Sequence, residues 1–217
     1  MDQNSIISYT KAQRYQTDLL LFLCVFVTDA MSIPLSQNIK VALSTVLCGF
    51  IVLKDIANGK LFKDNYRTKW VLIPCLFIII PQLIYFDFVL SYESKILQIW
   101  AGYILFKKIP KELFIQKYVK LLYYICIISI PIWLSTVMRL NFWEWAPSSG
   151  DGQYKTLFFY CVDTYGENGR NNGPFWEPGV FQMYINIAVL FLLYSKNNIN
   201  IKYLLIFVIA LATTYST

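Results

Sequence analysis

Histidine is absent from this chain of 217 residues, and its cysteines never form a C-x-x-C pair. Protein zinc sites draw on His and Cys ligands, and the common Ser or Cys nucleophiles take an imidazole as their base. The sequence therefore excludes zinc centres of the usual kinds, Cys–His nucleophilic sites and Ser–His triads. Four of the five cysteines lie inside apolar stretches, where a free thiol behaves as a small hydrophobic group.

Charge is also scarce. Asp, Glu, Lys and Arg make up 15% of the residues, whereas 57% are hydrophobic, and an average soluble domain has about 25% charged residues. The net charge is +6, but the cations stand in short blocks between apolar stretches and form no basic amphipathic face. This pattern argues against a nucleic-acid partner and is typical of a protein embedded in a lipid bilayer.

Long apolar runs fill the sequence instead. An α-helix needs about 20 apolar residues to cross the hydrocarbon core of a bilayer. We therefore predict an all-α, polytopic transmembrane helix bundle of about seven spans, forming a single domain over residues 1–217. The apolar stretches are residues 19–35, 39–53, 70–90, 96–106, 118–137, 180–194 and 201–215. The second and fourth are short enough to be re-entrant or interfacial segments instead.

The first stretch has two readings. Lys11 and Arg14 before an apolar core resemble the start of a signal peptide. No small-residue cleavage site follows, and the apolar run continues past Ala30. These features favour a first transmembrane helix over a cleaved signal.

The distribution of cations predicts the orientation. Most Lys and Arg residues lie in the N-terminal tail and in the second, fourth and sixth connections between the stretches. Cytoplasmic connections carry the excess of Lys and Arg in membrane proteins. We therefore expect a cytoplasmic N-terminus and a large outward-facing loop over residues 138–175. Trp143 and Trp145 in this loop fit either an interfacial aromatic belt or a surface that stacks on sugars or lines a lipid.

Residues 169–179, at the end of this loop, combine three glycines, two prolines, an Arg and a Glu. Glu177 followed by Pro178 fits the start of a helix, since Pro suits the first turn and a carboxylate suits the positive end of the helix dipole. The planar guanidinium of Arg170 suits bidentate binding of a phosphate or diphosphate. The alternative for Glu177 is a helix-start role alone, and for Arg170 a solvated loop charge.

The pattern R-x-x-G-x-F-x-E-P-G-x-F, from Arg170 to Phe181, resembles the O-antigen polymerase/O-antigen ligase superfamily. In that superfamily an Arg, a Gly-containing turn and an aromatic precede Glu-Pro or Asn-Pro at the start of a transmembrane helix. Glu-Pro favours a polymerase over a ligase. The Ser/Thr-rich residues 212–217 are similar to the polar end of the next span in that family.

The resemblance implies a membrane glycosyltransferase on the outer face of the bacterial cytoplasmic membrane. Such a polymerase joins polyprenyl-diphosphate-linked oligosaccharide units into O-antigen, capsular or exopolysaccharide. It implies no metal and no cofactor, in keeping with the absence of an Asp-x-Asp motif, and it suggests a flippase and chain-length regulators as partners. Family members have ten or more spans and a second outward loop, so we expect residues 1–217 to be the N-terminal portion of a longer polymerase.

The residues that match the motif receive roles by this resemblance. Arg170 and Glu177 are the candidate catalytic residues: Arg170 stabilises the departing diphosphate and Glu177 takes the proton of the acceptor hydroxyl. Asp163 and Glu167 are alternative bases with no support from their positions. The candidate substrate-binding residues within the motif are Gly173, Trp176, Pro178 and Gly179. Outside the motif, Arg139 and Lys155 are candidate substrate-binding residues as weaker helpers of Arg170 at the leaving group.

Two other functions stay open. A multi-span transporter or flippase of lipid-linked glycans would fit the same hydropathy pattern, but it should carry charged groups near the bilayer midplane. The carboxylates in or beside the apolar stretches all lie near the ends: Asp18, Asp29, Asp87 and Glu93. The other alternative is an inactive, truncated membrane partner.

Overall fold

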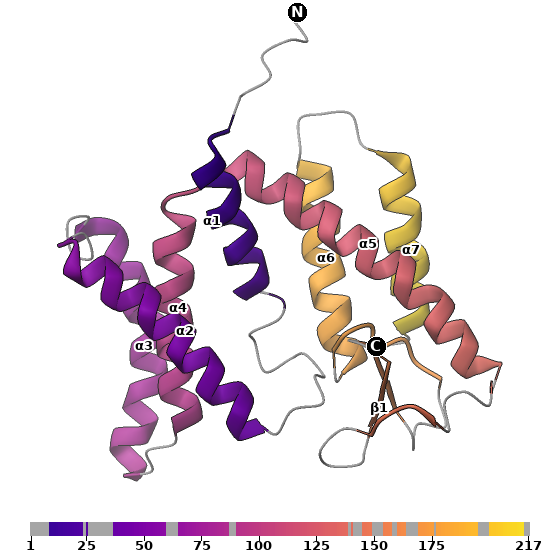
Figure 1. The fold of residues 1–217 in the computed structure, drawn as a ribbon, viewed down its shortest axis with the longest axis horizontal. Helices are drawn as coiled ribbons and strands as arrows, with labels where there is room; N and C mark the ends of the chain where they lie inside the picture. Colours follow the sequence, from indigo (N-terminus) through magenta and orange to yellow (C-terminus); the bar gives the residue numbers. More distant parts are fainter. Residues whose placement is uncertain are drawn as a thin grey trace, which may run out of the picture. The chain divides into compact units, whose positions relative to one another are not determined.

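The computed structural model describes residues 9–23, 25, 37–59, 65–86, 90–138, 140, 145–148, 154–157, 160–163, 169–175, 177–194 and 200–214. These residues form seven α-helices and one two-stranded hairpin (Figure 1), so the prediction of a mainly helical protein is confirmed. The chain divides into two compact units, which are described in turn. The first contains residues 1–24 and 41–114, and the second contains residues 25–40 and 115–217.

Among the described residues, one helix is both long and apolar enough to cross a bilayer. It is Lys111–Val137, with 27 residues. Trp70–Tyr85, Pro178–Tyr194 and Ile201–Thr214 are apolar but shorter.

The first unit holds α1 (Lys11–Phe22), most of α2 (Gln37–Ala57), α3 (Asn65–Tyr85) and α4 (Leu90–Phe106), and α4 packs against both α1 and α3. A capping box starts α1: Gln13 N donates to Thr10 Oγ1 at 3.2 Å, and Thr10 N donates to Gln13 Oε1 at 3.0 Å.

Side-chain hydrogen bonds join α2 to α4. The hydroxyls of Ser44 and Ser94 lie 2.9 Å apart, and Gln98 Nε2 donates to Ser44 Oγ at 2.7 Å. Polar side chains of this kind tie apolar helices together where few other polar partners exist.

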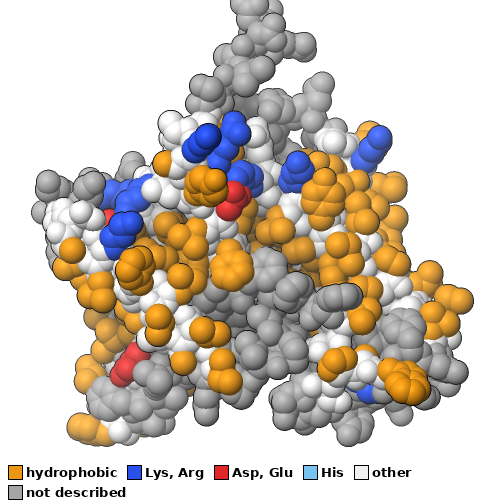
Figure 2. Space-filling view, viewed as in Figure 1, with side chains coloured by type: hydrophobic (Ala, Val, Ile, Leu, Met, Phe, Trp, Pro, Cys, Tyr) orange, Lys and Arg blue, Asp and Glu red, His pale blue; other side chains and the backbone are white. Residues whose placement is uncertain are grey.

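An ion pair joins the end of α2 to the segment just after α4 in the first unit. Lys108 Nζ, just after α4, lies 2.7 Å from Asp55 Oδ1 near the end of α2, and Asp55 is only 6% exposed. Figure 2 shows Lys and Arg side chains gathered at one end of this unit, with apolar side chains over much of the remaining face. Its exposed cations at the start of α1, at the end of α2 and around the end of α4 are Lys11, Arg14, Lys54, Lys107, Lys108 and Lys111.

The second unit is built from α5 (Lys111–Val137, from Ile115 onward), α6 (Pro178–Tyr194), α7 (Ile201–Thr214) and the hairpin of β1 (Tyr154–Leu157) and β2 (Tyr160–Asp163). The strands are antiparallel, with Tyr154 opposite Asp163 and Leu157 opposite Tyr160. The helix pair α6–α7 packs together.

Tyrosines connect α5 to its neighbours in this unit. Tyr118 donates to the carbonyl of Tyr184 on α6 at 3.1 Å. The ring centroids of Tyr123 on α5 and Tyr203 on α7 lie 4.2 Å apart. On the hairpin, Tyr160 donates to the carbonyl of Ile125 on α5 at 3.1 Å.

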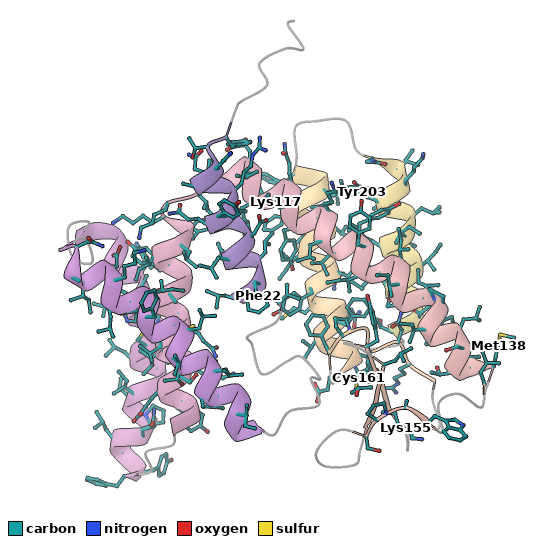
Figure 3. All side chains as sticks on the ribbon, viewed as in Figure 1. Phe22, Lys117, Met138, Lys155, Cys161 and Tyr203 are labelled. Carbon is teal, nitrogen blue, oxygen red and sulfur yellow. The ribbon has the colours of Figure 1, made fainter. Side chains whose placement is uncertain are left out.

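The hairpin marks one end of the second unit. In Figure 3, Lys155 and Cys161 lie at this end, whereas Lys117 and Tyr203 lie toward the other end of the helices. The start of α6 and the end of α7 both lie at the hairpin end (Figure 1).

Candidate functional site

Residues 169–175, here called the arginine loop, run from the hairpin side of the second unit toward α6. The loop begins at Gly169, which has a φ of 51° and whose carbonyl accepts a hydrogen bond from Trp133 Nε1 on α5. Arg170 follows and is exposed. The carbonyl of Gly173 accepts from Cys161 N on β2 at 2.9 Å, so both α5 and the hairpin hold the loop.

Asn171, next to the arginine, is the most densely bonded residue of the loop. Its Nδ2 donates to Ser129 Oγ on α5 at 3.2 Å and to Thr213 Oγ1 on α7 at 2.9 Å. Its Oδ1 accepts from Gly173 N at 3.0 Å, and its own N–H donates to the carbonyl of Thr213 at 2.9 Å. Asn171 is 3% exposed, and its partners come from two helices and from the loop itself.

Hydrogen-bond capacity explains why this position takes asparagine. The hydroxyl of Ser129 donates to the carbonyl of Cys126 within α5, and that of Thr213 donates to the carbonyl of Ala210 within α7. A hydroxyl has one proton, so each can only accept from Asn171. Two donors and one acceptor on a short side chain are therefore needed. Aspartate lacks the donors, and glutamine is one methylene longer.

Aromatic side chains of the loop and of α6 pack against each other. Phe175 is fully buried and stacks on Tyr184 of α6, with ring centroids 4.6 Å apart. Phe181, one turn into α6, lies 5.8 Å from Phe175 between ring centroids. Gly173 sits directly against Phe181 with a φ of 56°, and a Cβ there would lie 2.8 Å from Phe181 Cε1. Both the backbone conformation and the space therefore require glycine.

The helix start that the sequence predicts is present. α6 begins at Pro178, and Phe181 N donates to the carbonyl of Glu177 at 3.3 Å, so Glu177 precedes the first turn. Proline suits this position because the first N–H groups of a helix have no partner within the helix. The side chain of Glu177 is exposed.

Arg170 lines a small cavity of about 10 Å³. This is room for about one water molecule, so a sugar or a diphosphate does not fit inside this cavity. The cavity is lined by Ile132, Trp133, Thr136, Tyr160, Cys161, Arg170, Asn171, Asn172 and Gly173.

The candidate residues from the sequence are thus only partly brought together. Arg170 and Gly173 line the same cavity, whereas Glu177, Pro178, Gly179 and Lys155 are not part of its lining. Lys155 lies on β1 opposite Val162. Arg139, Trp176 and Glu167 lie outside the described residues, as does the side chain of Asp163.

The sequence reading missed Asn171 and its two hydroxyl partners. A signal was present: Ser129 and Thr213 are polar residues within apolar stretches, and Asn171 is an amide beside the one arginine of the motif. Pairing them required contacts between residues 42 positions apart, which no local pattern encodes.

The role of Tyr160 at the site is structural. Burial raises the pKa of its phenol well above the usual range. The phenol therefore keeps its proton near neutral pH and donates it to Ile125. Among the described residues, no three His, Cys, Asp or Glu side chains group closely enough to hold a metal ion.

A larger cavity of about 340 Å³ lies in the first unit, and its lining comes from α3 and the first turn of α4. It is lined by Phe77, Ile78, Pro81, Gln82, Tyr85 and Tyr92. Gln82 is 6% exposed and donates to the carbonyl of Ile78 at 3.1 Å, while its Oε1 has no hydrogen-bond partner among the described residues.

Comparisons of this chain with protein-family models, with curated proteins and with solved structures find no match.

Proposed function

We propose that this protein is a polytopic membrane glycosyltransferase of the polysaccharide-polymerase type. It joins polyprenyl-diphosphate-linked oligosaccharide units on the outer face of a bacterial cytoplasmic membrane. The observation that carries the proposal is the exposed guanidinium of Arg170, borne by a loop whose neighbouring residues are hydrogen-bonded to two helices. A permanently charged, bidentate donor on a fixed backbone suits a diphosphate group.

A bilayer environment is supported by the surface of the helices in the second unit. Large apolar side chains are exposed along α6 and α7, among them Leu190, Tyr194, Ile201 and Leu205, and Tyr194 is 90% exposed. Lipid tails are the natural cover for such faces, because contiguous apolar patches are rare on soluble monomers. Seven spans remain part of the proposal. By length alone, the 21 residues of α2 and of α3 each cover about 30 Å, and the apolar part of α3 is Trp70–Tyr85.

The orientation predicted from the sequence assigns each end of the second unit to one side of the membrane. Lys117 and Tyr203 lie toward one end, and the hairpin with Lys155 lies at the other (Figure 3). Lys202, at the start of α7, also lies far along the helix from Thr213, the partner of the arginine loop. In the proposed orientation, Lys117 and Lys202 face the cytoplasm and Arg170 faces out.

The proposed reaction is displacement at an anomeric carbon. A hydroxyl oxygen of the acceptor glycan forms the new bond to this carbon, and the bond from carbon to the diphosphate oxygen breaks. The diphosphate leaves with the electron pair, and the hydroxyl proton passes to a base, for which Glu177 is the candidate. Negative charge grows on the leaving group, so a cation fixed beside it stabilises the transition state more than the ground state.

The support around Arg170 is what this chemistry needs. A charged group whose backbone is already held in place requires less reorganisation when charge develops on the substrate. Removal of one such donor lowers kcat by about 10²–10³-fold in enzymes that stabilise an anionic group in this way. Substitution of Arg170 should therefore nearly abolish polymerisation without disturbing the fold, because its side chain is exposed.

The proposal is tested in cells that lack the chromosomal gene and express Arg170→Ala, Arg170→Lys or the control Lys202→Ala. Lys202 is another exposed cation of the second unit, at the far end of α7. Membrane levels of each variant are measured together with the chain length of the lipid-linked glycan. We expect single units with Arg170→Ala, short chains with Arg170→Lys and normal chains with Lys202→Ala. Normal chains with Arg170→Ala refute the proposal, and loss of unit export instead identifies a flippase.

A further inference from the structure

We infer that Asn171 is a positioning residue for Arg170, and that the docking of α7 through Thr213 sets the position of the arginine. This inference rests on the proposed function, because it concerns how the arginine of that site is held. It assigns a role to a helix that contributes no residue to the candidate catalytic pair.

The backbone on both sides of Arg170 is bonded to helices. Before it, the carbonyl of Gly169 accepts from Trp133 on α5. After it, the N–H of Asn171 donates to the carbonyl of Thr213 at 2.9 Å. The arginine side chain can rotate, but its Cα is held between these two contacts, so its reach is set by α5 and α7.

The contact with α7 involves both the backbone and the side chain of Thr213, in the last described turn of that helix. The N–H of Asn171 donates to the carbonyl of Thr213 at 2.9 Å, and Asn171 Nδ2 donates to Thr213 Oγ1 at 2.9 Å. Two hydrogen bonds to one residue therefore join the arginine loop to α7.

The amide of Asn171 also fixes the turn that follows. Its Oδ1 accepts from Gly173 N at 3.0 Å while its Nδ2 holds both helices. All these groups are buried, so a lost partner is not replaced readily by water, and the remaining groups tend to rearrange. A displaced end of α7 should therefore move the arginine, and a shift of about 1 Å can lower a rate about 10²-fold.

A matched pair of threonines tests this role. Thr213 and Thr214 are adjacent and both buried, but the hydroxyl of Thr214 donates within its own helix, to the carbonyl of Leu211 at 2.7 Å. Thr213→Val removes the hydroxyl that accepts from Asn171 Nδ2 and keeps the shape of the side chain. Thr213→Ser keeps this hydroxyl. Thr214→Val removes a hydroxyl that does not bond to the loop.

The experiment measures kcat and KM for glycan extension by the full-length gene product in proteoliposomes, with thermal stability and amide hydrogen exchange of residues 169–175. We expect Thr213→Val to lower kcat about 10²-fold with little change in KM, and to speed exchange in the loop. Thr213→Ser should recover most of the activity, and Thr214→Val should behave as the unsubstituted protein. Adding Arg170→Ala to Thr213→Val should give no loss beyond that of Arg170→Ala alone.

The outcomes separate the two proposals. If Arg170→Ala keeps full activity, the proposed function fails. If Arg170→Ala is inactive while Thr213→Val lowers only the melting temperature and keeps kcat, the positioning role alone fails. Should Thr213→Val not accumulate in membranes, Asn171→Asp replaces it, because it retains the acceptor for Gly173 and loses both donors. Unchanged kcat in that variant overturns the inference.

Discussion

Gly173 lies so close to Phe181 that a Cβ on the glycine would be 2.8 Å from the phenylalanine ring. Gly173→Ala should therefore move the arginine loop away from α6, in addition to the strain of an alanine at a φ of 56°. We expect a loss of stability of about 2 kcal/mol and a severe loss of polymerisation. Thermal unfolding in detergent and glycan chain length in cells measure the two effects.

Gly59 provides the matched control for this substitution. Its φ is 62°, but a Cβ there would meet nothing within 4 Å. Gly59→Ala thus reports the cost of the backbone conformation alone and should leave polymerisation intact. Equal effects of the two substitutions on activity would mean that the packing of Gly173 on Phe181 has no functional role.

The raised pKa of Tyr160 predicts a dependence of stability on pH. A tyrosine in the unfolded chain loses its proton near pH 10, whereas burial keeps Tyr160 protonated to higher pH in the folded protein. The contribution of this residue is therefore fully present below about pH 10 and falls as the pH rises above that value.

The variant Tyr160→Phe isolates that contribution from those of the other tyrosines. It loses the hydrogen bond to Ile125 and should be about 1 kcal/mol less stable near neutral pH. We expect the difference in melting temperature between the two proteins to shrink from about pH 9 to about pH 11. A difference that stays constant over this range would contradict the burial of the phenol.

The ion pair between Asp55 and Lys108 should stabilise the first unit. Lys108→Ala leaves Asp55, whose side chain is 8% exposed, without its cation, and we expect a loss of about 1–3 kcal/mol. The exposed neighbour Lys54 is the control, since Lys54→Ala should change stability by less than about 0.5 kcal/mol. The exchanged pair Asp55→Lys with Lys108→Asp should recover part of the loss. No recovery would show that the pairing is not what stabilises this end.

The proposed orientation predicts which positions are reached from outside the cell. Ser148 and Lys111 are both exposed, the first in the proposed outward loop and the second at the start of α5. The cysteines within the described residues, Cys48, Cys75, Cys126 and Cys161, are buried, which keeps their background labelling low. A membrane-impermeant maleimide should label Ser148→Cys in intact cells and Lys111→Cys only after lysis. The reverse pattern would place Arg170 in the cytoplasm and end the polymerase proposal.

Local patterns in the sequence predicted the helical fold and the start of α6 at Pro178, since hydropathy and proline act within a few residues of chain. The apolar stretches at 39–53, 96–106 and 118–137 are shorter than the helices that contain them, α2, α4 and α5. The stretch at 96–106 belongs to a helix that begins at Leu90, because Ser94 hydrogen-bonds to α2 and does not end the helix.

The centre of the arginine loop was not predictable in the same way. The importance of Asn171 arises from bonds to Ser129 and Thr213, which lie 42 residues away in either direction. Local patterns identified Arg170 and Gly173, whose residue types are unusual in their surroundings, but they did not identify the amide of Asn171 between them. Long-range polar contacts of this kind become visible only once the helices are packed.

The most direct test of the account is the reaction itself. The full-length gene product is reconstituted in liposomes with polyprenyl-diphosphate-linked oligosaccharide, and the release of polyprenyl diphosphate is measured together with glycan length. The account predicts that diphosphate release and chain growth proceed in step with the unsubstituted protein and with Lys202→Ala, and that both stop with Arg170→Ala. Chain growth at the normal rate with Arg170→Ala, or no chain growth with any of the three proteins, would contradict it.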